Sequence, residues 1–214
     1  MKICTCVVVA SLAGSVQAQS LAISITPDIT VAGIGDTVTW TIRAELLNPL
    51  QGEVIRAVVS DFGFDLDHGG DTDLSILNNE FQPAFDSTFF GPAADGVVSG
   101  DSIIGAVGVN TLPPLNNPSG PDDSNPLLIY TYQTTVTGGN ARIIEPSLTL
   151  VGQISGAYIG TPFDQVFFYQ LADGSPGTVP FSIDPGQVAV VPGPGVLMIA
   201  GGAGLLGFRR RRMG

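Results

Sequence analysis

Hydrophobic and polar residues alternate along the middle of the chain, most regularly over residues 36–46, DTVTWTIRAEL. Val38, Trp40 and Ile42 alternate there with threonines and Arg43. A period of two, with β-branched and aromatic residues, is typical of a half-buried strand. We therefore expect this stretch to form a strand with one face in the core and the other in solvent.

Other stretches share this strand composition: residues 21–26, 54–66, 102–109, 127–137, 142–152, 164–171 and 187–191, and more weakly 85–90. Pro146 cannot donate to a central ladder, so 142–152 is predicted to be an edge strand, a bulge or two strands. Five prolines predict a long irregular loop over 110–126. Eight to ten strands, without a convincing helical period, predict an all-β fold: a single antiparallel β-sandwich over residues 19–190.

The composition fits one domain flanked by processing segments. The chain has 214 residues, of which 44% are hydrophobic and 13% charged, which is enough apolar material for a core. All nineteen acidic residues lie between Asp28 and Asp184, where only three arginines oppose them, so this body has a formal charge of −16. Such a surface repels phosphate backbones, and we do not expect nucleic-acid binding.

The first eighteen residues have the three parts of a secretory signal peptide. Lys2 supplies the positive region, residues 3–13 the apolar region, and Val16-Gln17-Ala18 the cleavage site, with cleavage predicted after Ala18. The alternative is a buried first strand. Cys4 and Cys6 lie inside this segment, so a cleaved chain would contain no disulfide, zinc–thiolate site or cysteine nucleophile.

The last 24 residues combine two prolines, an uncharged run over 195–208 and a basic end. As a helix the run would be about 21 Å long, against a hydrocarbon core of about 30 Å, so we expect transient membrane association. The basic end would keep the tail inside and the body outside the cell. It consists of Arg209, Arg210, Arg211 and Arg212.

This arrangement resembles the PEP-CTERM sorting signal. Val191, Pro192, Gly193 and Pro194 match its sorting motif, and the four arginines match its basic end. The resemblance implies processing by an exosortase, a membrane-embedded cysteine transpeptidase of bacteria that make exopolysaccharide. Gly193 departs from the family, which usually has glutamate there, and this puts recognition by a standard exosortase in doubt. The alternative is a plain C-terminal anchor.

The body resembles cohesins and carbohydrate-binding modules in the order of its elements. The matching stretches are GIGDTVTWTI (33–42), FDLD (64–67) and LIYTY (128–132), the last followed by Gly138-Gly139. The resemblance implies a jelly-roll sandwich. Because a sandwich hosts many functions, it indicates the fold more than any partner.

The acid-rich stretch DLDHGGDTD (65–73) is a candidate calcium site. Carboxylates are the oxygen ligands that Ca²⁺ prefers, but an EF-hand loop would need a glutamate where Ile76 stands. The alternative is a solvated acidic turn. The candidate ligands are Asp65, Asp67, Asp71 and Asp73.

Catalytic chemistry has little support in the sequence. Gly100-Asp101-Ser102 resembles the nucleophile step of GDSL-type esterases, yet no histidine follows Ser102. Without a base to take its proton, that hydroxyl is not activated. His68, the sole histidine, is expected to be a solvated loop residue. We expect no cofactor and no enzyme activity.

Aromatic residues on the expected strands have two interpretations. They could stack on sugar rings, or they could simply pack in the core. The residues concerned are Trp40, Tyr130, Tyr132, Phe167, Phe168 and Tyr169.

These observations together predict an exported bacterial cell-surface or extracellular-matrix protein with a structural, adhesive or carbohydrate-associated role. The expected partners are an exosortase-type transpeptidase and extracellular polysaccharide. The alternatives are a small secreted polysaccharide-active hydrolase, which could use paired carboxylates, and a plain membrane-anchored ectodomain.

Overall fold

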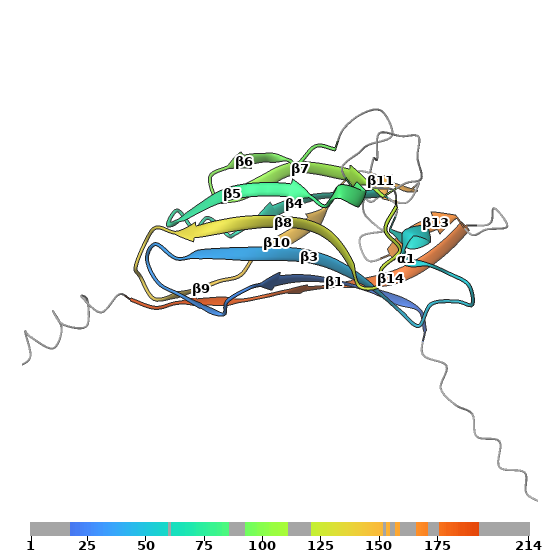
Figure 1. Cartoon of the computed structure of the whole chain (residues 1–214), viewed down its shortest axis with the longest axis horizontal. Coiled ribbons are helices and arrows are strands. Elements are labelled where there is room, and N and C mark those ends of the chain that lie inside the picture. The colour runs from blue at the N-terminus through green and yellow to red at the C-terminus, as the bar shows by residue number, and fades with distance from the viewer. Residues whose placement is uncertain are drawn as a thin grey trace, which may run out of the picture.

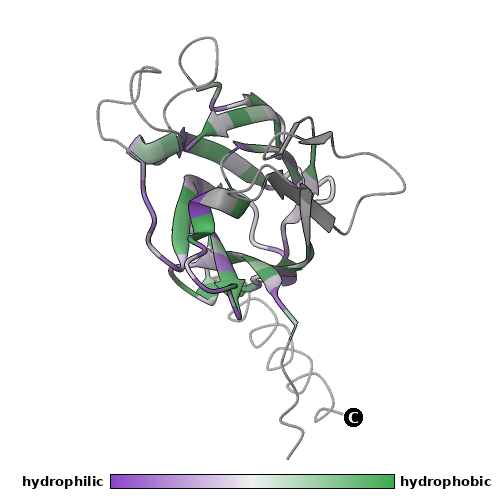
Figure 2. Cartoon of the chain, turned by 90° about the vertical axis from the view of Figure 1, so that its right-hand side faces the viewer, coloured by the Kyte–Doolittle hydropathy of each residue, from purple (hydrophilic) through white to green (hydrophobic). Residues whose placement is uncertain are grey.

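Two β-sheets face each other in the computed structural model of the protein (Figure 1). The structure describes residues 18–59, 61–85, 93–110, 121–151, 153–154, 157–158, 166–170 and 176–192. Figure 2 shows the layers from one end, with hydrophobic and hydrophilic positions alternating along the strands. This alternation gives each sheet one apolar face, and the two apolar faces pack together.

The larger sheet has six strands in the order β13 (Val166–Gln170), β14 (Pro176–Pro185), β1 (Ser20–Pro27), β3 (Thr37–Leu47), β8 (Leu127–Val136) and β5 (Leu74–Phe81). The smaller sheet has four, in the order β10 (Ser147–Leu150), β4 (Asp61–Asp67), β7 (Ser102–Val109) and β6 (Val97–Ser99). Two minor sheets are formed by β2 (Val31–Ala32), β15 (Val188–Val190) and β9 (Arg142–Ile144), and by β11 (Gln153–Ile154) and β12 (Ala157–Tyr158).

The core lies between the two main sheets. Val38, Trp40 and Ile42 of β3 point inward and are fully buried, as are Phe62 and Phe64 of β4. The indole Nε1 of Trp40 donates a hydrogen bond to Thr134 Oγ1 at 2.8 Å, so this buried polar group has a partner. The predicted amphipathic strand over 36–46 is thereby confirmed.

The prediction of an all-β sandwich is confirmed, but its strictly antiparallel character is wrong. Strands β1 and β14 pair in parallel over Leu21–Ile25, and β2 and β15 also pair in parallel. These contacts join the two ends of the described chain. A local hydrophobic pattern does not encode the direction of so distant a pairing.

Three other predictions need correction. Residues 54–66 begin with a short helix, α1 (Ile55–Val58), rather than with a strand, so only β4 remains of the predicted strand. Strand β14 was not predicted, because its three prolines indicate turns. Strand β5 was missed because two asparagines interrupt its alternation, and Asn78 has a φ of 48° there.

Pro146 divides the stretch 142–152 into two strands, which is one of the predicted alternatives. Strand β9 precedes it and β10 follows it, and the two belong to different sheets. Of the predicted weak strand over 85–90, only Phe85 is described, at the end of a 3-10 helix, η1 (Pro83–Phe85); residues 86–90 lie outside the described residues. Among the described residues, no helix is long and apolar enough to cross a membrane.

Both predicted processing segments lie mainly outside the described residues. Ala18, the predicted cleavage position, is exposed, and its carbonyl oxygen accepts a hydrogen bond from Asn48 Nδ2 at 3.3 Å. At the other end, the backbone N–H of Val191 donates to Ala32 O at 2.9 Å. Residues 1–17 and 193–214, with Gly193, Pro194 and the four arginines of the sorting hypothesis, are not described.

Candidate functional site

The acid-rich stretch connects β4 to β5 at one end of the sandwich. Asp65 Oδ1 accepts the backbone N–H of Gly105 at 2.7 Å, and Asp67 Oδ1 accepts the N–H of Gly69 at 2.9 Å and the hydroxyl of Ser102 at 3.1 Å. These two carboxylates therefore hold the backbone of β7 and of their own turn. The Ser102 hydroxyl thus donates to the carboxylate of Asp67, which is itself exposed.

The other two predicted ligands are tied to β9 by Arg142. The guanidinium Nε of Arg142 contacts Asp71 Oδ2 at 2.6 Å, and Nη2 donates to the carbonyl oxygen of Asp73 at 3.2 Å. Nη1 donates to the carbonyl oxygens of Gly138 and Asn140, at 3.1 and 3.2 Å. Arg142 thus fastens the β4–β5 connection to the β8–β9 connection.

These contacts leave the calcium hypothesis as a prediction. Within the described part of the chain, no group of three or more His, Cys, Asp or Glu side chains is placed to hold a metal ion. The acid-rich stretch accepts hydrogen bonds from the N–H groups and the guanidinium described above. These donors supply the positive charge that faces its oxygen atoms.

His68 is buried in this end of the sandwich, and the expectation of a solvated histidine is wrong. Only 6% of the residue is exposed, and its ring lies 5.7 Å from the ring centre of Trp40 and 5.8 Å from that of Tyr132. Neither ring nitrogen has a hydrogen-bond partner in the described structure. Burial lowers the pKa of His68 from 6.5 to about 4, against the opposing effect of Asp101, Asp67 and Asp71.

Two more buried polar atoms near His68 are without hydrogen-bond partners among the described residues: Asp101 Oδ2 and the hydroxyl of Tyr132. Asp101 lies in the β6–β7 turn, and its carbonyl oxygen accepts the backbone N–H of His68 at 3.3 Å. Burial raises the pKa of Tyr132, so its phenol stays protonated. Sequence reasoning named Asp101 only as part of the esterase-like Gly100-Asp101-Ser102 and did not single out Arg142, because both act through contacts distant along the chain.

The aromatic sugar platform is wrong for three of its members. Trp40, Tyr130 and Tyr132 are 0% exposed, and Trp40 and Tyr132 stack with ring centres 6.0 Å apart. They are core residues, which was the alternative interpretation. Phe167, Phe168 and Tyr169 lie in β13, whose side chains are outside the described part of the structure.

The outer face of the smaller sheet carries an exposed row of aliphatic side chains. We call Val97, Ile104 and Val107 the apolar stripe; they are 71%, 50% and 36% exposed. Val97 of β6 stands directly opposite Ile104 of β7. The three side chains are neighbours on one sheet face, and contiguous apolar patches of sufficient area mark interaction sites.

A β-bulge creates the stripe. On β7, Ile104 and Gly105 together stand opposite the single residue Asp65 of β4, and Gly105 has a φ of 71°, which glycine adopts readily. The extra residue shifts the alternation, so Ile104 and Val107 both face outward. The Asp65 carboxylate accepts the Gly105 N–H and so fixes the bulge. Two isoleucines are adjacent in SIIGAVGV, so the sequence pattern could not show which of them is exposed.

Carboxylates stand directly beside the stripe. Asp65 and Asp67 lie on β4, next to β7, and Asp67 pairs across from Ser102. The face therefore offers aliphatic contacts along one strand pair and negative charge along the neighbouring strand. A surface with apolar and basic side chains is its complement.

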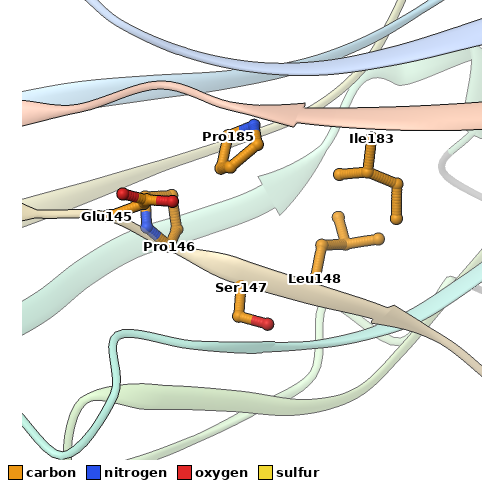
Figure 3. Close-up of a pocket in the computed structure, with 6 residues that line it drawn as sticks. All are labelled: Glu145, Pro146, Ser147, Leu148, Ile183 and Pro185. Atoms are coloured by element: carbon orange, nitrogen blue, oxygen red, sulfur yellow. The ribbon is translucent and has the colours of Figure 1, made fainter.

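A shallow groove of about 320 Å³ lies where β10 and β14 approach each other (Figure 3). Leu148 and Ile183 point toward one another and form its floor, and Pro146 and Pro185 lie at one end (Figure 3). Ser147 points away from them (Figure 3). The groove lies at the boundary between the two main sheets.

The fold defines a class: an all-β sandwich of two main sheets, with exposed aliphatic side chains on the outer face of the smaller sheet. Neither a family model nor a curated protein sequence matches the chain.

Solved structures of cohesin modules are similar in architecture. One, CaCohA2 from Clostridium acetobutylicum, is 10% identical and covers 83% of this chain and 94% of its own, with a TM-score of 0.48. A type I cohesin–dockerin complex from Clostridium thermocellum is 13% identical over 80% and 99%, with a TM-score of 0.47. The second type II cohesin module of the ScaA scaffoldin from Acetivibrio cellulolyticus is 10% identical over 80% and 96%, with a TM-score of 0.41.

Proposed function

We propose that the protein is an exported structural or adhesive module that acts by binding another protein through the outer face of its smaller sheet. The observation that carries this proposal is the apolar stripe, whose central Ile104 is 50% exposed. Exposed aliphatic side chains on a rigid, hydrogen-bonded sheet lose little conformational entropy on binding. The partner surface would be apolar and basic, because Asp65 and Asp67 border the stripe.

The export route that we propose rests on the two ends of the sequence. Residues 1–18 would direct secretion, and residues 191–214 would act as a sorting signal read by an exosortase-type transpeptidase. The body would then reach the cell envelope or the extracellular matrix. Strand β1 begins at Ser20 and β15 ends at Val190, so removal of both segments would spare the described strands.

The binding face can be tested with a matched pair of substitutions. A photo-crosslinking amino acid at Ser99, on β6 beside the stripe, reports a protein bound to this face in the native host. We expect Ile104→Lys to reduce the crosslinked adducts about tenfold. An aliphatic side chain that becomes buried against the partner contributes that much or more to affinity. Gel electrophoresis and immunoblotting of the adducts measure the effect.

Ile143→Lys is the control for this experiment. Ile143 is 58% exposed on β9, outside both main sheets, and the substitution is chemically identical. It should leave the adducts unchanged. Absence of any protein adduct in the wild type, or an equal loss in both variants, would refute binding through the stripe.

The sorting proposal predicts the intact mass of the mature protein isolated from its host. We expect a species that starts at Gln19 and ends near Pro194, with any added mass located at its new C-terminus. Mass spectrometry of the purified protein measures both ends at once. A species that still ends at Gly214 would reject sorting and leave a membrane-anchored ectodomain.

A further inference from the structure

The first residue of the exported chain would be Gln19, and its side chain is held by a carboxylate. Gln19 Nε2 donates a hydrogen bond to Glu53 Oε2, which also accepts the backbone N–H of Leu50 at 3.1 Å. The next residue is fixed by strand pairing, since Ser20 stands opposite Leu47 at the end of the β1–β3 ladder. The loop that connects β3 to α1 therefore binds the chain where the predicted cleavage would create a new N-terminus.

The second carboxylate oxygen of Glu53 is buried and unpaired. Glu53 Oε1 has no hydrogen-bond partner within the described part of the chain. The arginines that form ion pairs among the described residues are engaged elsewhere, Arg56 with Asp123 and Arg142 with Asp71. A buried carboxylate oxygen without a partner costs free energy, and native proteins almost always satisfy such atoms. We therefore expect a donor or a cation to reach this oxygen in the mature protein.

We propose that Glu53 binds the α-ammonium group of the mature chain and thereby keeps Gln19 from cyclising. Cleavage after Ala18 converts the amide nitrogen of Gln19 into a primary ammonium group. The ammonium and the carboxamide belong to one residue, so one carboxylate can bind both, with Nε2 at Oε2 and the α-nitrogen at Oε1. The inference rests on the cleavage in the proposed export route, and neither the apolar stripe nor the C-terminal segment takes part.

An unprotected N-terminal glutamine converts itself to a cyclic lactam, pyroglutamate. The neutral α-amino nitrogen attacks the side-chain carbon Cδ, a new N–Cδ bond forms, and the Cδ–Nε2 bond breaks. Nε2 leaves as ammonia and takes the proton that the amine gives up. Both contacts of Glu53 oppose this step. The ion pair favours the protonated amine, which is not a nucleophile, and the hydrogen bond to Nε2 restrains the side chain that must close the ring.

The test is the chemical state of the N-terminus in the mature protein purified from its host, as wild type and as Glu53→Gln. Peptide mass spectrometry distinguishes glutamine from pyroglutamate by the mass of one ammonia molecule. We expect the freshly isolated wild type to carry an intact glutamine. During incubation at neutral pH the variant should cyclise about tenfold faster, because a carboxylate that raises the α-amino pKa by about one unit removes about nine-tenths of the neutral amine.

Glu45→Gln is the matched control. Glu45 is exposed on β3, opposite Ala22 of β1, and the substitution changes the charge of the body equally. This variant should cyclise at the wild-type rate, and unchanged circular dichroism should show that both variants are folded. Pyroglutamate in the fresh wild type, or equal rates in the wild type and Glu53→Gln, would overturn the proposal. A mature chain that begins elsewhere than at Gln19 would reject it together with the cleavage position, whereas a failure of binding at the apolar stripe would leave it intact.

Discussion

Acid is expected to remove about 3 kcal/mol from the free energy of unfolding between pH 6.5 and pH 4, because His68 is buried without a hydrogen-bond partner. In the unfolded chain this histidine takes up a proton below about pH 6.5. In the folded protein burial holds its pKa at about 4. Over this window the unfolded state binds more protons than the folded state, so stability falls as the pH falls.

The groups facing His68 reduce this effect without reversing it. Asp101, Asp67 and Asp71 each raise the pKa of His68, but desolvation outweighs them. Tyr132, the other titratable group packed against the ring, is uncharged in this range because burial raises its pKa. Below about pH 4 the folded protein also protonates His68, and this contribution to the pH dependence ends.

Urea denaturation at pH 7 and at pH 4.5, for the wild type and for His68→Phe, measures the histidine contribution. Phenylalanine keeps an aromatic ring between Trp40 and Tyr132 and cannot titrate. Between these two pH values we expect the free energy of unfolding of the wild type to fall by most of the 3 kcal/mol. The variant should lose clearly less, and its remaining loss would come from carboxylates, which both proteins contain. Parallel losses in the two proteins would contradict the assignment to His68.

Arg142→Ala is expected to destabilise the protein by about 2–4 kcal/mol. The substitution removes the contact with Asp71 and three hydrogen bonds to the carbonyl oxygens of Asp73, Gly138 and Asn140. The side chains of Arg142 and Asp71 are only 19% and 16% exposed, so water replaces the lost partner incompletely. Thermal and urea unfolding measure the loss.

Arg56→Ala is the matched control for Arg142. Arg56 forms an ion pair with Asp123 at 3.2 Å, but these side chains are 26% and 41% exposed. Solvent screens such a pair, so its removal should cost less than about 1 kcal/mol. Equal losses in the two variants would show that Arg142 does not fasten the two loops.

Local pattern was sufficient where the sequence alternates cleanly. The stretches at 36–46, 102–109 and 127–137 became β3, β7 and β8, and the proline at 146 separated two strands. At 36–46 the periodicity of two also determines which side chains enter the core, whatever the partner strand is. Composition also identified two terminal segments whose interpretation remains a prediction.

Contacts between distant segments decided the rest. Strand β14 contains prolines that argue against a strand, yet it pairs with β1, more than 150 positions away. Its residues 176–180 pair with β13 and its residues 181–185 pair with β1, so each half has a single partner strand and tolerates residues that cannot donate. The bulge at Gly105 decided which isoleucine is exposed. His68 lies in a polar, acidic stretch, and only its packing on Trp40 and Tyr132 buries it.

The sequence by itself therefore determined the class of fold, most of the long strands and the acidic character of the body, since these follow from alternation and composition. Only the tertiary structure decided the parallel pairing, the exposed stripe and the buried histidine. These depend on register and on the relative placement of the two sheets. Whether a side chain at these positions is buried or hydrated depends on residues far from it in the chain.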